Sequence, residues 1–598
     1  MNRPRKRKKN YPAVATPEGA ELSDGRALSP LQLDIAISTA LALITLIPYA
    51  QTFSFDFVNF DDPGYVYENV LLRDGLTLAS VFDATFGFHQ ANWHPLVWLS
   101  YMLEIELFGM SPGPMHITNV VLHILSSLVL YLWLRSATGC IVRSLLAALI
   151  FAIHPEHVES VAWITERKDV LSTLFFYITL ASYTRYCQTA EKFWYIGSLI
   201  AFAIGLTAKG MLVTVPVVLL LIDVWPLNRL QLDCSFLTLI KALRRLVAEK
   251  IPFILLSAAL CLITIAAQKS GGAMTDLQVL TIGERLANSA VACVRYCLMT
   301  VWPLGLSVYY PMPDGGWHIG VVVLAFLFLV TVTTVSVLFR KNRPVILVGW
   351  MWFLFTLVPV IGLVQVGIQS MADRYMYIPG VGLSLLLVWS IPDRFFRFDV
   401  LPISVMALLT AILLSVTYFQ VSYWRDSISL FRHSIDVVPK RNVVAFHNLP
   451  LAYLRARDYE KAIDILQPAL NAYDTDPVLW IHLGNAMRGL NRSDDAIECF
   501  RKAVKFDPTS SEALNNLGLL LCRTNNAEGM HYIQRAIEAE PGNAHAHNSL
   551  GNALVRAGDL SSAEKSYLTA IRLGNLPEAK QNLDYILSLP EVDSAIKE

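Results

Sequence analysis

Long apolar blocks fill the chain from about Pro30 to Gln420, and this feature restricts the fold to one that spans a membrane. The first block, LDIAISTALALITLIPYAQTF, has the roughly 20 residues that one helix needs to cross a bilayer. Only 16% of the residues are charged, against about 25% in a typical soluble domain. No ten-residue alternating pattern of a membrane barrel is found, so the predicted fold class is all-α.

The basic N-terminus predicts the orientation of the chain. Residues 1–30 begin with MNRPRKRKKN, and positive charge beside a first membrane helix favours a cytoplasmic location. A cleaved signal peptide fits less well, because a Ser/Pro/Gly-containing stretch separates the basic cluster from the apolar run and no small-x-small site follows. We predict that this tail orients the protein and that it binds no nucleic acid.

Basic residues between the apolar blocks predict about eleven crossings. The block at 287–303 is expected to be interfacial or re-entrant, because it carries Arg295 and leads into WPLGLSVYYPMP. The membrane domain would then span residues 31–425, and residues 426–598 would lie outside the cytoplasm. A twelfth crossing would reverse that placement. The short first loop and the basic N-terminus favour a bacterial inner-membrane protein with a periplasmic C-terminal domain.

The C-terminal region contains about four repeats of similar sequence. The equivalent positions Pro450, Gly484, Gly518 and Gly551 are 34, 34 and 33 residues apart, and the fullest pattern comprises Trp480, Leu483, Gly484, Ala496, Phe500, Ala503 and Pro508. This pattern resembles the tetratricopeptide repeat, in which glycine and alanine allow paired helices to approach closely. The expected structure is an α-solenoid whose groove binds a protein or peptide; a spacer or dimerisation element is the alternative.

Three polar clusters interrupt the apolar blocks on the side predicted to lie outside. They lie in VNFDDPGYVYEN with the later NWHP segment, in HPEHVESVAWITERKD, and in MADRYMYIP; Lys209 lies in a turn on the same side. The candidate residues are Asp61, Asp62, His94, His154, Glu156, His157, Glu159, Glu166, Arg167, Lys168, Asp169, Lys209, Asp373, Arg374 and Tyr375.

Considered without the other clusters, Asp61 and Asp62 are interpreted as ordinary acids of a Pro-Gly turn. Taken together, the clusters have the composition expected of a site for an anionic, lipid-linked donor. Lysine and arginine would hold a phosphate, and an acid would take the proton of an attacking hydroxyl. Asp62 is slightly favoured over Asp61 for that role.

The HPEH segment also raises the question of a metal site. His154 and His157 are three residues apart and could share an ion if they were on one helix. Pro155 interrupts that helix, and no third strong ligand is spaced on the same face. We therefore predict no required cofactor, with a divalent metal as the weaker alternative and a hydrogen-bonded cluster that fixes the loop as the expected arrangement.

The order of motifs resembles the transmembrane-and-TPR O-mannosyltransferase family over nearly the whole chain. The resemblance rests on VNFDDPGYVYEN, His116-x-x-Asn119-x-x-x-His123, HPEHVESVAWITERKDVLS, LTAKGMLVTVPVVLLLIDVWPL, MADRYMYIP and the repeats. It implies a GT-C glycosyltransferase domain that takes a sugar from a polyprenyl- or dolichyl-phosphate carrier. It also implies that Asp61 or Asp62 is the catalytic acid and that Arg167, Lys168, Lys209 and Arg374 bind the carrier phosphate.

Three functions are consistent with the sequence. The leading one is an inverting transferase that moves mannose or a similar hexose from a polyprenyl phosphate in the bilayer to a Ser or Thr of a protein held by the repeats. The second is a polymerase or ligase of lipid-linked glycans, which would need a different acceptor groove. The third is a non-catalytic membrane anchor for the repeats, which would not need so many polar groups on one side of the membrane domain.

Overall fold

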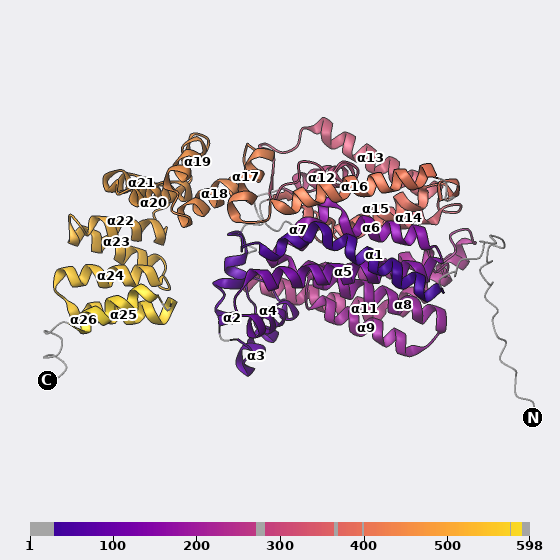
Figure 1. The fold of residues 1–598 in the computed structure, drawn as a ribbon, viewed down its shortest axis with the longest axis horizontal. Coiled ribbons are helices and arrows are strands. Elements are labelled where there is room, and N and C mark those ends of the chain that lie inside the picture. The colour runs from indigo at the N-terminus through magenta and orange to yellow at the C-terminus, as the bar shows by residue number, and fades with distance from the viewer. Residues whose placement is uncertain are drawn as a thin grey trace, which may run out of the picture.

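The computed structural model describes residues 29–73, 75–270, 281–363, 369–396, 400–574 and 576–588, so the segment MNRPRKRKKN lies outside the described residues. The predicted all-α class is confirmed: two short strands pair with each other, and helices make up the architecture. Figure 1 shows a bundle of long helices joined at one end to a curved stack of shorter helices.

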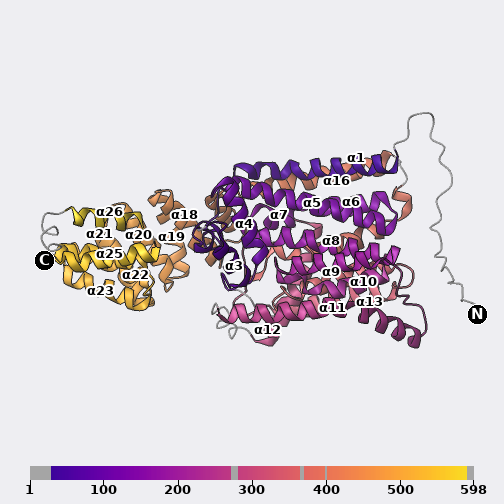
Figure 2. The same ribbon diagram turned by 90° about the horizontal axis from the view of Figure 1, so that it is seen from below.

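The bundle consists of twelve helices, which are α1 (Pro30–Tyr49), α5 (Pro112–Thr138), α6 (Ile141–Ile153), α8 (Arg167–Thr189), α9 (Lys192–Leu206), α10 (Val215–Val224), α11 (Phe236–Ser270), α12 (Ile282–Val301), α13 (Ile319–Leu338), α14 (Pro344–Leu357), α15 (Pro379–Ser390) and α16 (Val400–Ser422). Capping boxes start two of them: Ser29 with Gln32 at α1, and Thr281 with Glu284 at α12. Helices α1 and α16 lie side by side, although they are the first and the last of the bundle (Figure 2).

Five helices among the described residues are long and apolar enough to cross a membrane, namely α1 with its extension, α5, α11, α13 and α16. A sixth span is formed if α6 and α7 (Val158–Ala162) count as one, with a bend of 53° between them. Helices α9, α10, α14 and α15 are apolar but shorter. The chain is therefore a multi-pass membrane protein, and the eleven crossings stay a prediction.

Short elements cover the end of the bundle that faces the repeats. They are η1 (Ala50–Ser54), the π-helical turn η2 (Pro63–Tyr67), α2 (Val70–Arg73), α3 (Leu78–Phe86), α4 (Pro95–Phe108), η3 (Pro155–His157), α7, η4 (Ile164–Glu166), η5 (Gly210–Thr214), β1 (Tyr310–Pro311), β2 (Gln369–Met371) and η7 (Asp373–Met376). The turn η8 (Asp393–Phe396) lies instead between α15 and α16. The three predicted polar clusters lie on or beside the first group, except that Arg167, Lys168 and Asp169 lie in the first turn of α8.

The repeats form the second body, and the predicted boundary at 425/426 falls in the turn before it. Its helices are α17 (Ser427–Val437), α18 (Val443–Arg455), α19 (Tyr459–Ala472), α20 (Pro477–Gly489), α21 (Ser493–Phe506), α22 (Ser511–Leu521), α23 (Asn526–Ala539), α24 (Ala544–Ala557), α25 (Leu560–Gly574) and α26 (Pro577–Leu587). A Cβ atom at Gly484 would lie 2.6 Å from the ring of Phe500, and one at Gly551 would lie 2.4 Å from the ring of Tyr567. Glycine therefore permits the close helix approach that the sequence pattern predicts.

The repeats contact the same loops that carry the two adjacent acids. The backbone N–H of Asn59 donates to Ser427 Oγ (2.9 Å), and its side-chain amide donates to the carbonyl of Asn448 (3.0 Å). Arg455 donates to the hydroxyl of Tyr67 (3.0 Å). These contacts place the first repeat beside the Asp61-Asp62 turn.

Candidate functional site

A cavity of about 530 Å³ lies where the three polar clusters meet. Its polar wall contains Asp61, Tyr65, Asn92, His94, Glu166, Lys168, Lys209, Gln369, Arg374 and Tyr375. The rest of its lining, called the apolar wall here, is more apolar and includes Met211, Val213, Leu260, Cys261, Ile265, Pro359 and Val360. The cavity therefore joins a charged region to an apolar wall that α11, one of the candidate membrane spans, helps to form.

Glu166 is the centre of the charged wall. One of its oxygens lies 3.2 Å from Lys168 Nζ and 3.5 Å from Arg374 Nε, and the other lies 3.2 Å from Lys209 Nζ. Burial alone would raise the pKa of Glu166, but the three cations outweigh it and hold the pKa below its ordinary value. One carboxylate thus positions three cations that come from separate segments of the chain.

Asp61 lines this cavity and is half-buried. Among the described residues no hydrogen bond to its carboxylate is formed, although its backbone carbonyl accepts the N–H of Tyr65 (2.9 Å). Burial raises the pKa of Asp61 above its ordinary value, and the charges of Lys168 and Arg374 oppose that rise. The carboxylate oxygens are therefore available to a ligand, with a raised proton affinity.

Asp62 points away from the cavity into the protein. One of its oxygens accepts hydrogen bonds from Trp163 Nε1 (3.0 Å), Thr165 Oγ1 (2.5 Å) and the Thr165 N–H (3.3 Å), and the other accepts the Val58 N–H (2.9 Å). Burial raises its pKa to about 6, and the bonds from Thr165 and Val58 oppose the rise. Asp62 therefore ties the first loop to the WITERK segment and fixes where Asp61 lies.

Arg374 is held by Glu159 and Glu166, two acids of the second cluster. Its Nη1 lies 2.5 Å from Glu159 Oε1, and its backbone N–H donates to Glu159 Oε2 (2.9 Å). The preceding Asp373 accepts the hydroxyl of Tyr310 (2.9 Å), beside the pairing of β1 with β2. Asp373 thus anchors the loop, and Arg374 presents its guanidinium to the cavity.

Lys209 lies in the turn after α9 and contacts Asp169 as well as Glu166. Asp169 is buried and also accepts the hydroxyl of Ser160 (3.0 Å). Burial alone would lower the pKa of Lys209, but the carboxylates of Asp169 and Glu166 raise it above its ordinary value. This lysine therefore stays charged at the cavity wall.

Arg167, a predicted phosphate ligand, lies elsewhere. Its side chain is completely buried; Nη2 contacts Glu104 Oε2 (2.9 Å) and the carbonyl of Met115 (2.8 Å), and Nε contacts Asn119. The guanidinium also lies 5.0 Å from the ring of Tyr101. These contacts join α4, α5 and α8, and Arg167 is not among the residues that line the cavity.

Polar residues of the NWHP segment and of the stretch just before MADRYMYIP complete the polar wall. Asn92 donates to the hydroxyl of Tyr65 (3.0 Å), and Gln369 donates to that of Tyr375 (3.0 Å). His94 has a buried Nδ1 without a hydrogen-bond partner in the described part of the chain, and burial with the nearby lysines lowers the pKa of His94 to about 3. Asn92 and Gln369 were not predicted as site residues; Asn92 belongs to the NWHP segment and Gln369 lies two residues before MADRYMYIP, so their place in the sequence was their only signal.

The remaining predicted residues form a separate cluster at the turn between α6 and α7. His154 Nε2 bonds to the carbonyl of Thr300 (3.0 Å), Glu156 accepts the hydroxyl of Thr300 (3.0 Å), and His157 Nδ1 bonds to the carbonyl of Phe151 (2.8 Å). None of the three lines the 530 Å³ cavity. Within the described ranges no group of three or more His, Cys, Asp or Glu side chains is arranged to hold a metal ion.

Comparison with family models identifies two kinds of region. A model described as dolichyl-phosphate-mannose-protein mannosyltransferase matches residues 94–268, which include His94, Glu166, Lys168 and Lys209. Tetratricopeptide repeat models match residues 477–510, 499–531 and 523–579. The repeats predicted from the glycine spacing are thereby confirmed.

Curated relatives carry the name protein O-mannosyl-transferase. Human TMTC1 is 24% identical over 543 residues, covering 82% of this chain and 57% of the relative, and human TMTC3 is 24% identical over 599 residues, covering 90% and 64%. Mouse TMTC2 is 30% identical over 218 residues, covering 34% and 26%. The chain thus spans less than two thirds of the length of these relatives. The resemblance to the transmembrane-and-TPR O-mannosyltransferases is confirmed.

Proposed function

We propose that this chain is an inverting membrane glycosyltransferase that moves mannose or a similar hexose from a polyprenyl-phosphate carrier to a Ser or Thr hydroxyl of a protein. The observation that carries the proposal is the cavity in which Asp61, with no hydrogen bond to its carboxylate among the described residues, faces Lys168, Lys209 and Arg374. The mannosyltransferase names of the relatives and of the matching family model agree with it.

Asp61 is the general base of the proposed reaction. It takes the proton of the acceptor hydroxyl while the hydroxyl oxygen attacks the anomeric carbon of the sugar. The bond between that carbon and the phosphate oxygen breaks, and the polyprenyl phosphate leaves from the opposite face, which inverts the configuration. A positioned base of this kind contributes about 10²- to 10⁴-fold to the rate.

The three cations stabilise the phosphate as it leaves. Arg374 offers the N–H groups that remain after its contacts with Glu159 and Glu166, and Lys168 and Lys209 each present an ammonium with three donors. The carboxylate of Glu166 keeps the cations together when no phosphate is bound. His94, neutral because of its lowered pKa, supplies one further hydrogen-bonding group at Nδ1.

The apolar wall of the cavity suits the hydrocarbon part of the carrier. Leu260, Cys261 and Ile265 lie along α11, and Met211 and Val360 face the same space. Contact between an isoprenoid chain and these side chains removes apolar surface from water or lipid headgroups, whereas the phosphate remains at the charged wall. The donor would therefore enter from the bilayer with its phosphate near Lys168.

The repeats deliver the acceptor in this proposal. The bonds from Asn59 and Tyr67 to the first repeat set that repeat beside the Asp61 turn. A polypeptide bound in the solenoid groove would thus be held near the base. The site and the repeats would face the compartment outside the cytoplasm, which is the periplasm of a bacterial inner membrane.

The direct test uses purified protein in detergent with three mannose donors: polyprenyl-phosphate mannose, dolichyl-phosphate mannose and a nucleotide-linked mannose. Transfer to a Ser/Thr peptide from a lipid-phosphate donor, with inverted stereochemistry, supports the proposal. Transfer only from the nucleotide-linked donor contradicts the proposed polyprenyl-phosphate carrier. Retention of configuration at the anomeric carbon contradicts the proposed inverting mechanism. In a deletion strain, unchanged protein glycans with altered surface polysaccharide would instead support a glycan ligase.

A further inference from the structure

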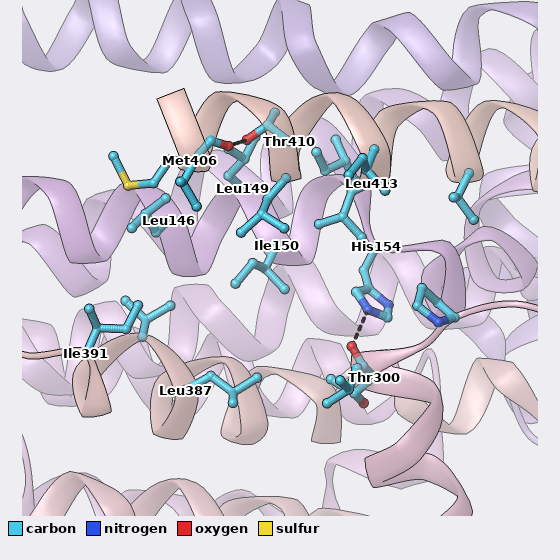
Figure 3. Close-up of a pocket in the computed structure, with 18 of the residues that line it drawn as sticks. Leu146, Leu149, Ile150, His154, Thr300, Leu387, Ile391, Met406, Thr410 and Leu413 are labelled. Atoms are coloured by element: carbon cyan, nitrogen blue, oxygen red, sulfur yellow. Dashed lines mark hydrogen bonds between the residues drawn. The ribbon is translucent and has the colours of Figure 1, made fainter. Parts of the chain in front are cut away.

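A second cavity, of about 690 Å³, is a groove between α6, α15 and α16 (Figure 3), and some residues that line it, such as Leu409 and Ile412, are exposed at the surface of the bundle. Apolar side chains such as Leu149, Ile150, Leu387 and Leu413 make up most of its lining, and the close-up shows them pointing into one elongated space. The site residues around Asp61 do not border it. A molecule bound in this groove would therefore not touch the residues around Asp61.

The histidine and the two threonines of the lining already have partners inside the protein. His154 bonds to the carbonyl of Thr300, the hydroxyl of Thr300 donates to Glu156, and the hydroxyl of Thr410 donates to the carbonyl of Met406 (2.9 Å). The part of a ligand that occupies the groove would consequently meet a hydrocarbon surface, so it is itself hydrocarbon.

The length of the groove matches one leaflet of a bilayer. Along α16 the lining runs from Val405 to Val416, and a helix rises 1.5 Å per residue, so the groove is about 17 Å long. The hydrocarbon core of a bilayer is roughly 30 Å thick, so half of it is about 15 Å. The turn at His154 bounds one end of the groove. A groove of this length fits a single acyl chain and does not fit a long isoprenoid chain.

The other end of the groove, at Ile391, Phe395 and Phe396, carries arginine side chains. Arg143 donates to the carbonyl of Ile391 (2.9 Å) and lies 4.7 Å from the ring centre of Phe396. Arg394 lies 5.1 Å from the ring centre of Phe395. These residues surround the opening next to the start of α6, whereas the Asp61 cavity lies beyond the other end of that helix.

The charge at this opening is positive. Asp393 pairs with Arg143 (2.7 Å) and balances one of the arginines. Arg343 donates to the carbonyl of Ser390 (3.1 Å) and is exposed, as is Arg394. Neither has a carboxylate within ion-pair distance in the part of the chain that the structure describes. An anionic headgroup would complement them, because guanidinium groups bind phosphate oxygens well.

We propose that this groove binds an anionic phospholipid of the leaflet opposite the Asp61 cavity. One acyl chain lies between α6 and α16, and the phosphate contacts Arg343 and Arg394. The bound lipid fills a gap that would otherwise leave α16 poorly packed against α6 and α15, so it also stabilises the bundle.

Native mass spectrometry of the purified full chain tests the proposal with phosphatidylglycerol, phosphatidylcholine and undecaprenyl phosphate as probes. Wild-type protein is expected to retain one phosphatidylglycerol in preference to the other two. Leu149→Trp fills the groove and is expected to lower that retention at least about tenfold. Leu408→Trp is the matched control, because Leu408 is 60% exposed on the same helix bundle and does not line the groove.

The double variant Arg343→Gln/Arg394→Gln tests the headgroup without altering the core, since both side chains are exposed; Arg185→Gln, an exposed arginine on α8, is its control. Loss of the preference for phosphatidylglycerol over phosphatidylcholine supports the proposal. Wild-type retention by Leu149→Trp or by the double variant overturns it. Equal retention of phosphatidylcholine, or displacement by an equal concentration of undecaprenyl phosphate, overturns it as well.

Discussion

Asp61 and Asp62 are adjacent in the chain, but their carboxylates have opposite surroundings. The carboxylate of Asp62 accepts four hydrogen bonds from Val58, Trp163 and Thr165, whereas that of Asp61 faces the cavity and accepts none from the described residues. One acid therefore holds the loop in place, and the other is available for proton transfer.

Replacing Asp62 by Asn is expected to reduce stability. Both oxygens of Asp62 accept hydrogen bonds, so the NH₂ group of Asn would face a donor on either side: the Val58 N–H, or the Trp163 and Thr165 groups. A buried donor left without an acceptor in this way costs about 1–3 kcal/mol. Thermal melting in detergent measures the loss, with Asp56→Asn, an exposed acid of the same loop, as the control. A variant with the wild-type melting temperature but no transfer would point to Asp62 as the base instead.

The pH profile of transfer is expected to carry the signature of Asp61. The base must be ionised, so kcat/KM falls as the pH drops through the pKa of Asp61, which burial raises above its ordinary value. Lys168 opposes that rise, so Lys168→Gln should move the acidic limb to higher pH. Profiles of the two proteins at matched donor saturation measure the shift. If the acidic limb of the Lys168→Gln profile lies at lower pH than that of the wild type, the assignment of Asp61 as the base is contradicted.

Lys168 is expected to act on the donor phosphate more than on stability. Glu166 keeps Lys209 and Arg374 as partners when Lys168 is replaced, so Lys168→Gln should lower transfer by about 10²- to 10³-fold with a small change in melting temperature. Lys192→Gln, at the exposed start of α9, is the matched control. Equal activity of the two variants would exclude Lys168 from phosphate binding.

Arg167 is expected to be structural. Removing one member of a buried ion pair costs about 3–5 kcal/mol, so Arg167→Gln should destabilise the protein by leaving Glu104 unpaired. The double variant Arg167→Met/Glu104→Leu removes both charges and should recover part of the melting temperature and of the transfer activity. Recovery of stability without any activity would show instead that Arg167 binds the donor.

Gly484 is expected to tolerate no larger residue, because a Cβ atom there would lie 2.6 Å from the ring of Phe500. Gly484→Ala should destabilise the repeats by about 1–3 kcal/mol. Faster hydrogen exchange in α20 and α21 of the full chain measures this effect. Gly542→Ala, where a Cβ meets open space, is the control. Unchanged exchange at α20 and α21 would contradict the packing account.

The sequence predicted the membrane helices and the repeats, and part of each of the three polar clusters lines one cavity. Apolar block length predicts membrane helices, and the glycine spacing predicts the paired repeat helices that the models match. The presence of Glu166, Lys168, Lys209 and Arg374 in or near the three clusters also predicted a charged site. Each of these inferences depends on local pattern or on the shared side of the membrane, which a linear sequence carries.

The orientation of neighbouring side chains could not be predicted in this way. Asp61 and Asp62 differ because Trp163 and Thr165, about a hundred residues later, bond to only one of them. The residues at His154 and Glu156 lie away from the cavity because the chain bends by 53° there and both bond to Thr300 of α12. Such long-range contacts are set by packing and leave no periodic signal.

Transfer by Asp61→Asn tests the central claim most directly. Wild type, Asp61→Asn and the control Asp56→Asn are purified, and mannose transfer from polyprenyl-phosphate mannose to a Ser/Thr peptide is measured together with donor binding and melting temperature. The account predicts a rate about 10²- to 10⁴-fold lower for Asp61→Asn alone, with donor binding and melting temperature close to those of the wild type. A wild-type rate of transfer by Asp61→Asn would contradict it.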